Sequence, residues 1–258
     1  MNKAGGIYGR RLEFTAAPSN QDLANSVFAI VATLDQTPAP SRVPSLGPIS
    51  NAAANSSTYT VVASIADQIA VLGEYLRTRH LRRVYWVRSE FLFDDDVASA
   101  WAELTKRGIV EHAETKTGAD ALLFTGSVTD LERLLREGPN DLPVATLNVI
   151  AGQRAFDWPA NESRRLLLVY PALLPEDIDF SAVSRIGAPA RYVVPLTVAL
   201  AAARVAIEAL KRTGRDLTRE GFGQALESLH EFRTELVPPV TFGPQHYAGV
   251  RGGVYRDR

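Results

Sequence analysis

Residues 192–221, YVVPLTVALAAARVAIEALKRTGRDLTREG, contain the pattern that decides the fold. Leu196, Leu200, Ala203, Ile207 and Leu210 recur at intervals of three and four within residues 195–213, while charged side chains occupy the other faces. This spacing predicts a long helix packed against a large core. Gly214 is placed as the stop of that helix. Thr218 then opens a second amphipathic helix, which we predict over residues 219–230.

Four stretches, taken together, resemble a known family. They are EALKRTGR at residues 208–215, LTREG at 217–221, VTFGPQHYAG at 240–249 and NKAGGIYGRRL at 2–12. The combination is similar to the motifs of type I periplasmic binding proteins, specifically the branched-chain amino-acid (Leu/Ile/Val-binding) receptors of ABC transporters. The family's first strand has no counterpart in the chain, so the resemblance is to a shortened form.

The resemblance implies an α/β fold with two lobes, each a parallel sheet flanked by helices, with crossing strands as the hinge. Lobe 1 would comprise residues 1–80 and 189–236, and lobe 2 residues 81–188 and 237–258. The residue pattern agrees, because strand-like and helix-like segments alternate as in parallel βαβ units. The predicted strands are 11–16, 27–33, 43–50, 58–64, 83–88, 121–125, 142–147 and 165–170, and the predicted helices between them are 65–80, 130–137 and one ending at Gly108.

One of these strands has an unusually apolar sequence. Val27-Phe-Ala-Ile-Val-Ala-Thr33 contains no charged residue and no alternation of polar and apolar side chains. A continuous apolar run of strand length is typical of a parallel strand that is covered on both faces. We therefore expect this strand to lie inside a sheet with packing on either side.

Composition limits the possible functions. The 258 residues are 46% hydrophobic and 22% charged, with 28 Lys and Arg against 29 Asp and Glu, so nothing indicates a nucleic-acid partner. With no cysteine, disulfides and thiolate chemistry are excluded, and the four histidines lack the spacing of a zinc site. Residues 94–96 are three aspartates, which fit a helix N-cap better than a metal site. The sequence has no nucleophile elbow and no Walker A loop. We expect no enzyme activity, no cofactor and no metal.

The location of the protein follows from the resemblance, which implies the periplasm. Residues 1–6 lack the apolar segment of a signal peptide, so a leader and a first strand would precede Met1 in the native gene, or this form has lost them. The apolar run from Val193 to Leu210 is interrupted by Arg204 and Glu208. This interruption indicates a buried helix and not a membrane span.

The resemblance also implies a ligand and a partner. The ligand would be a small carboxylate, either an amino acid or an aromatic acid, held in the cleft between lobes that close around it. The partner would be the permease of an ABC transporter. A ligand-sensing or protein-interaction module of the same fold, without a transport role, is the alternative. An α/β enzyme is the third possibility.

The candidate ligand contacts of lobe 1 lie where strands end, since ligands of open α/β sheets bind beyond the carboxyl ends of the strands. The family's loop equivalent to residues 46–51 cradles the ligand's carboxylate, which makes Ser50 the first candidate. A Gly-Pro turn whose serine caps the next helix explains Ser50 equally well. Asn51 and Ser64 are further candidates at strand ends of the same lobe.

The candidates of lobe 2 are Glu90, Phe91 and Tyr170. Glu90 and Phe91 follow a predicted strand directly, and a buried ammonium group needs an anionic partner such as Glu90. A solvated loop carboxylate is the alternative for Glu90. The family often presents an aromatic side chain at the position of Tyr170, although an ordinary core tyrosine fits that position too. The other residues that end strands of this lobe are interpreted as structural: Thr125, Gly126 and Asn148.

Overall fold

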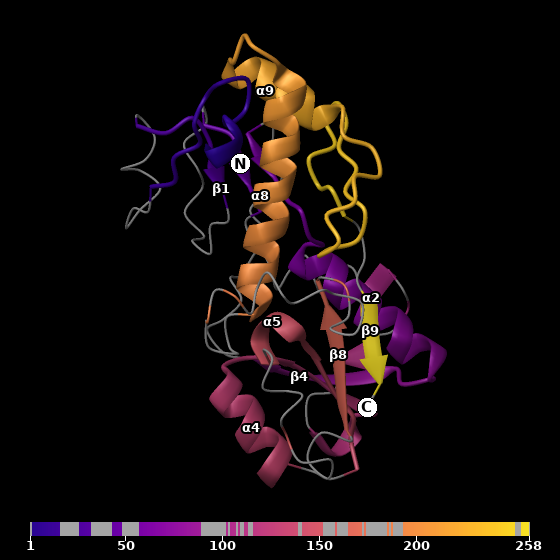
Figure 1. The fold of residues 1–258 in the computed structure, drawn as a ribbon. Helices are drawn as coiled ribbons and strands as arrows, with labels where there is room; N and C mark the ends of the chain where they lie inside the picture. Colours follow the sequence, from indigo (N-terminus) through magenta and orange to yellow (C-terminus); the bar gives the residue numbers. More distant parts are fainter. Residues whose placement is uncertain are drawn as a thin grey trace. The chain divides into compact units, whose positions relative to one another are not determined.

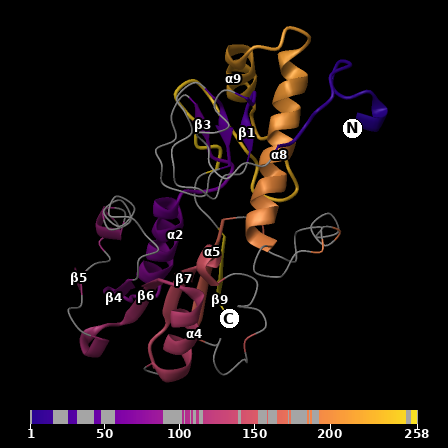
Figure 2. The ribbon, with the colours of Figure 1, turned by 90° about the vertical axis from the view of Figure 1, so that its left-hand side faces the viewer.

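The structure is a computed structural model that describes residues 2–15, 26–31, 43–47, 57–88, 102, 104–106, 108, 111–112, 116–138, 141–151, 158, 165–171, 173, 185, 187, 193–250 and 254–257. Within these residues the helices are α2 (Ile65–Thr78), α4 (Val128–Glu137), α5 (Asn148–Ala151), α8 (Val193–Thr213) and α9 (Arg219–Glu227), with short 3-10 helices at Asn2–Ala4 and Lys116–Gly118. The strands are β1 (Ile30–Val31), β2 (Ser45–Leu46), β3 (Thr58–Tyr59), β4 (Arg83–Arg88), β5 (Glu111–His112), β6 (Ala121–Thr125), β7 (Val144–Leu147), β8 (Leu166–Tyr170) and β9 (Val254–Asp257) (Figures 1 and 2).

The chain divides into two compact units. Unit 1 comprises Met1–Val62 and Thr197–Val250, and unit 2 comprises Ala63–Leu196 and Arg251–Arg258. The chain therefore passes from one unit to the other three times, which is the number of crossings that the resemblance implies.

All three boundaries of the units differ from those of the expected lobes, and the smallest difference is at residues 189–196, which were expected in lobe 1 and belong to unit 2. Residues 63–80 were expected in lobe 1, but helix α2 packs against strands β7 and β8 of unit 2. Residues 237–250 were expected in lobe 2, but Val240 pairs with Phe232 and Ala248 pairs with Thr60, both in unit 1. In each case tertiary packing, which the local pattern does not record, decides the unit.

Unit 1 contains a three-stranded parallel sheet in the order β1-β2-β3. Ser45 is the register partner of both Ile30 in β1 and Thr58 in β3. The parallel arrangement predicted from the alternation of strands and helices is confirmed here. The predicted strand at residues 11–16 is wrong for its described part, because residues 11–15 form no strand.

Helix α8 supplies much of the core of unit 1. From Thr197 onward its buried residues are Thr197, Val198, Ala201, Ala202, Val205, Ala206 and Ala209, which recur at helical spacing. The face selected from the sequence is a different one, because Leu196, Leu200, Ala203, Ile207 and Leu210 are only half-buried. The helix ends at Thr213, and Gly214 follows with φ of 79°, the left-handed conformation that favours glycine. Helix α9 then begins after Thr218, whose side chain accepts a hydrogen bond from the Gly221 N–H.

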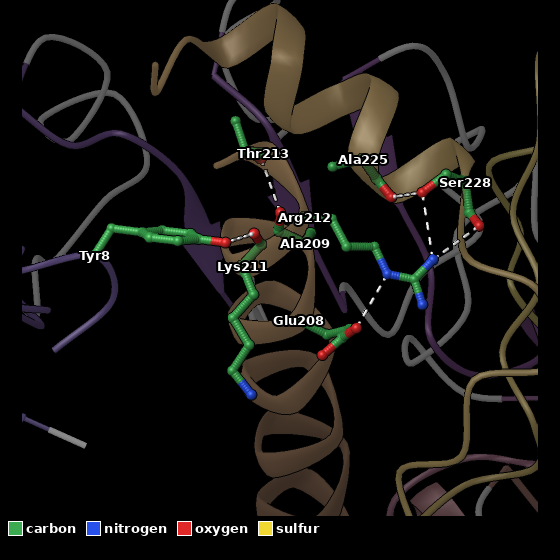
Figure 3. A network of polar contacts seen from close by, with 8 residues as sticks. All are labelled: Tyr8, Glu208, Ala209, Lys211, Arg212, Thr213, Ala225 and Ser228. Carbon is green, nitrogen blue, oxygen red and sulfur yellow. Dashed lines mark hydrogen bonds and ion pairs between the residues drawn. The ribbon is translucent and has the colours of Figure 1, made fainter. Parts of the chain in front are cut away.

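Side chains from the N-terminal segment bind the end of α8. The Tyr8 hydroxyl donates to the Lys211 carbonyl over 3.1 Å, and the Arg10 guanidinium donates to the carbonyls of Gly214 and Arg215 over 2.6 and 3.0 Å. Figure 3 shows Tyr8 reaching the last turn of α8 from the neighbouring segment. These contacts add to the backbone hydrogen bonds that the Lys211 and Arg215 carbonyls accept from the N–H groups of Gly214 and Leu217, so the N-terminal segment is fastened to the chain where α8 ends.

Arg212 joins the same end of α8 to the end of α9. Its Nε donates to Glu208 over 3.0 Å, and its terminal nitrogen donates to the Ser228 carbonyl over 3.0 Å (Figure 3). The two helices are therefore fixed to each other by a side chain that also forms an i,i+4 ion pair within α8.

The C-terminal motif at residues 240–249 packs around Tyr59 of β3. The Tyr59 ring meets the rings of Phe242 and Tyr247 edge to face, at centroid distances of 5.3 and 5.4 Å. Burial raises the pKa of the Tyr59 hydroxyl far above its usual range, and Glu227 and Tyr247 raise it further. Tyr59 is therefore a neutral core residue at every physiological pH.

Unit 2 contains a six-stranded sheet in the order β5-β4-β6-β7-β8-β9. Strands β5 to β8 are mutually parallel, as predicted, while β9 is antiparallel to β8. Every residue of β6, β7 and β8 is buried, which is the pattern of a parallel sheet covered on both faces. The sequence did not predict β9, a four-residue strand whose partner lies far away in the chain.

The carboxylate of Asp120 holds the start of β4. One carboxylate oxygen accepts from the backbone N–H groups of Arg82 and Arg83 over 3.0 and 2.8 Å, and the other accepts from the Arg83 guanidinium over 3.1 Å. The Arg83 N–H is the first cause of a lowered pKa of this carboxyl. A lowered folded-state pKa gives stability that is present above the unfolded pKa and is lost as the pH falls through the folded value.

We expect Asp120→Asn to lower the free energy of unfolding by about 1 kcal/mol at pH 7, the usual scale for a lost charge-assisted hydrogen bond. The difference from the wild-type chain should shrink as the pH falls below about 4, because the wild-type carboxyl is then protonated too. Urea unfolding at several pH values measures this, with the exposed Asp141→Asn as the control. A deficit that stays constant down to pH 2.5 would contradict the charge as its cause.

Gly249 leaves no room for a side chain. A Cβ atom there would lie 2.5 Å from Val240 Cγ1 and 2.7 Å from Phe242 Cε1. We expect Gly249→Ala to cost about 1–3 kcal/mol of unfolding free energy through overpacking, measured by urea unfolding. Gly118→Ala is the matched control, since a Cβ at Gly118 meets nothing within 4 Å. Equal effects of the two substitutions would show that the close packing around Tyr59 is not responsible.

Candidate functional site

Four of the six predicted ligand contacts lie outside the described residues: Ser50, Asn51, Glu90 and Phe91. The structure describes the chain up to Gly47 on one side of the first pair. Gly47 has φ of 83° and its N–H donates to the Tyr59 carbonyl over 2.8 Å. A glycine is therefore required where the chain leaves β2 and enters the segment that carries Ser50.

Ser64 is the N-cap of helix α2. Its backbone is extended (φ −60°, ψ 163°), its Oγ accepts from the Asp67 N–H over 3.0 Å, and its hydroxyl donates to the Asp67 carboxylate over 2.8 Å. This is the reciprocal arrangement of a helix start, with an acidic residue near the positive end of the helix dipole. The only proton of the hydroxyl is thus already donated, and a ligand contact by Ser64 stays a prediction.

Tyr170 ends strand β8 inside the core of unit 2. It is 3% exposed and lies in the cluster formed by α2 and the four central strands. The neighbouring strand end belongs to Asn148, the first residue of α5, which is fully buried. Leu147 of β7 is the register partner of Val169 of β8. Asn148 and Tyr170 are the residues that directly follow these two. Two buried polar residues therefore lie at neighbouring strand ends on this edge of the sheet.

Thr125 places a third polar group at the same edge. It ends strand β6, is fully buried and accepts a hydrogen bond from the Trp86 indole N–H over 2.7 Å. The hydroxyl of Thr146, in the next strand, donates to the Phe124 carbonyl over 2.8 Å. Hydroxyl, amide and phenol groups thus lie where the parallel strands β6, β7 and β8 end.

A helix also begins at this edge. Helix α4 follows β6 after two residues and is capped by Ser127, which accepts from the Asp130 N–H over 3.2 Å. Backbone N–H groups at helix N-termini point outward at the carboxyl end of a parallel sheet, where ligands of open α/β folds bind. We therefore take Thr125, Asn148 and Tyr170 as the candidate site of unit 2. Of these, the sequence analysis selected only Tyr170, although the strand-end position of Thr125 and Asn148 was visible.

No group of three or more His, Cys, Asp or Glu side chains among the described residues could hold a metal ion. In the same part of the chain, α8 is long and apolar enough to cross a membrane by length and composition alone. A core helix passes that test as well, and the buried positions of α8 described above are those of a core helix.

No protein-family model and no curated protein sequence matches the chain. Solved structures do match. A substrate-binding periplasmic protein from Ralstonia solanacearum has a TM-score of 0.71 and 17% identity, over 98% of this chain and 88% of that one. The chain has the type I periplasmic-binding-protein fold. The fold expected from the motifs is confirmed.

Two further solved structures match the chain, and the descriptions of these two proteins mention different ligands. A branched-chain amino-acid ABC transporter protein from Thermus thermophilus, with bound valine, has a TM-score of 0.68 and 16% identity, over 94% of this chain and 73% of that one. A fatty-acid ABC transporter substrate-binding protein from Thermomonospora curvata has a TM-score of 0.71 and 16% identity, over 98% and 79%. At this identity the likeness concerns the fold.

The capping role of Ser64 can be separated from a ligand role with a matched pair. Ser64→Ala and Ser127→Ala each remove an N-cap of the same type, so each should cost about 1 kcal/mol of unfolding free energy. Urea unfolding of the two variants measures this. If Ser64→Ala alone were fully stable, the hydroxyl would not be acting as a cap.

Proposed function

We propose that this chain is a solute-binding receptor that delivers a small carboxylate to the permease of an ABC transporter in the periplasm. The observation that carries the proposal is the match of the whole chain to a substrate-binding periplasmic protein. The buried polar groups at the carboxyl edge of the unit 2 sheet support it, because such an edge is where this class of sheet binds ligands. The chain would act by binding and release, without catalysis.

The ligand would be held by its carboxylate. Valine and a fatty acid, named for two of the solved structures, share a carboxylate and differ in the ammonium group. We assign carboxylate binding to Ser50 and Asn51, with Phe91 and Tyr170 as apolar contacts of the side chain. Glu90 would pair with an ammonium group, since a desolvated charge needs an opposite one. The choice between amino acid and simple acid would therefore rest on Glu90.

Asn148 and Thr125 would support the site from within the sheet. Asn148 stands opposite Tyr170, and Thr125 holds the Trp86 ring by a hydrogen bond. A polar residue buried at a strand end costs free energy unless its hydrogen bonds are satisfied. Because both side chains are fully buried, their role would be to hold the strand ends in place and not to touch the ligand.

A ligand panel of valine, leucine, phenylalanine, benzoate and octanoate tests the proposal by thermal unfolding. A true ligand at a hundred times its dissociation constant adds about 2.7 kcal/mol of stability, because it binds the folded state alone. Ser50→Ala should weaken every hit, whereas Glu90→Gln should weaken amino acids by about tenfold or more and leave benzoate and octanoate unchanged. Isothermal titration of each hit with each variant measures the change.

Asp141→Asn, an exposed change in unit 2, is the control for the Glu90 variant. If no compound in the panel raises the unfolding midpoint, the receptor proposal fails for small carboxylates. The alternative of an interaction module without transport would then be favoured.

A further inference from the structure

The sheet of unit 2 grows in two directions from strand β4. In the order β5-β4-β6-β7-β8, the next strand of the chain, β5, lies on one side of β4, whereas the later strands lie on the other side. Because connections between parallel strands are right-handed, the connections that leave β4 and β6 run over opposite faces of the sheet. The carboxyl ends of β4 and β6 therefore form the topological switch point, which is where open α/β sheets bind their ligands.

Arg88 and Thr125 are the residues at this switch point. Arg88 ends β4, Thr125 ends β6, and the two are register partners. Register partners place their side chains on the same face of a sheet, so Arg88 and Thr125 lie side by side. Thr125 is fully buried, whereas Arg88 is exposed. Arg88 therefore presents a positive charge where a ligand of this sheet would bind.

The guanidinium of Arg88 lies over an aromatic ring that is fixed from within the sheet. Its Cζ is 5.1 Å from the ring centroid of Trp86, two residues earlier on the same face of β4. Trp86 is 5% exposed, and its indole N–H donates to the Thr125 hydroxyl oxygen over 2.7 Å. A cation is attracted to the face of an aromatic ring. The Arg88 side chain is therefore held in place more firmly than a freely solvated surface arginine.

Within the described part of the chain, no carboxylate forms an ion pair with Arg88. Asp130 lies in the first turn of α4, but its carboxylate already accepts from the Ser127 hydroxyl over 2.7 Å and pairs with Arg133. The amino end of α4, which follows Thr125 after two residues, adds the positive end of a helix dipole to this edge. These charges favour an anion, and a guanidinium binds a carboxylate through two parallel hydrogen bonds.

We propose that Arg88 is a specificity-determining residue of the receptor and that it binds a second carboxylate of the ligand. This inference rests on the proposed function, in which Ser50 and Asn51 bind the first carboxylate. The ligand is then a dicarboxylate or an acidic amino acid, and not a simple monocarboxylic acid. Glu90 would distinguish these two classes, since it pairs with the ammonium group that only the amino acid carries.

Glutarate and pentanoate are matched probes, because both have a five-carbon chain and they differ in the second carboxylate. Each is titrated calorimetrically into the full chain and into three variants. Arg88→Gln removes the charge, and Arg88→Lys keeps the charge but loses the planar pair of donors. Arg82→Gln is the control, since Arg82 is an exposed arginine at the other end of the same strand. Urea unfolding of the two Gln variants should give the same midpoint, so that a loss of affinity is not a loss of fold.

We expect glutarate to bind the wild-type chain at least tenfold more tightly than pentanoate, the scale of about one added charge-assisted interaction. Arg88→Gln should weaken glutarate binding at least tenfold and change pentanoate binding by less than about twofold. Arg88→Lys should retain part of the preference for glutarate, and Arg82→Gln should retain all of it. The preference should also shrink as the salt concentration rises from about 0.05 to 0.5 M, because salt screens exposed charges.

Equal affinities of the wild-type chain for glutarate and pentanoate would overturn the proposal and leave the receptor function intact. A preference for glutarate that survives Arg88→Gln would overturn it too, since another group would then bind the second carboxylate. Binding of valine or octanoate without any binding of glutarate would have the same meaning. If none of the carboxylates binds the wild-type chain, the proposed function itself fails, and this proposal fails with it.

Discussion

The edge-to-face packing of Tyr59 against Phe242 and Tyr247 holds unit 1 together across more than half of the sequence. Two backbone hydrogen bonds reinforce this packing. The Thr60 N–H donates to the Tyr247 carbonyl over 3.0 Å, and the Gly249 N–H donates to the Thr60 carbonyl over 2.8 Å. The segment after α9 is thereby fixed beside β3. The glycine at position 249 is needed because a side chain there would displace Phe242, one of the two rings.

In unit 2 the constraint is the complete burial of the central strands. A parallel strand covered on both faces can be apolar along its length, but the chain must leave the sheet at the strand's end, where backbone groups lose their partners. Polar side chains therefore collect at that edge, as Thr125, Asn148 and Tyr170 do. These three residues are themselves buried, so they form the inner support of the edge beyond which ligands of open α/β sheets bind.

How far the sequence predicts this structure depends on whether the signal is local. The helix of residues 193–213 and its stop at Gly214 were predictable, because periodicity and the left-handed glycine are properties of neighbouring residues. Strand β9 and the irregular course of residues 11–15 were not, because each depends on the presence or absence of a distant pairing partner. Likewise, Ser64 was selected as a strand end, whereas the helix that starts after it already uses its hydroxyl.

The edges of the two sheets are covered by segments from distant parts of the chain. In unit 2, the outer side of β8 is covered by the antiparallel strand β9. In unit 1, the outer side of β3 is covered by the segment that pairs through Thr60 and Ala248. Natural sheets protect such edges with charges, prolines or bulges when no strand covers them, because an open apolar edge promotes aggregation. The run from Val27 to Val31 contains no charge and no proline. Its composition is therefore that of an interior strand, which can be apolar along its length because its neighbours, and not its own side chains, keep it from solvent.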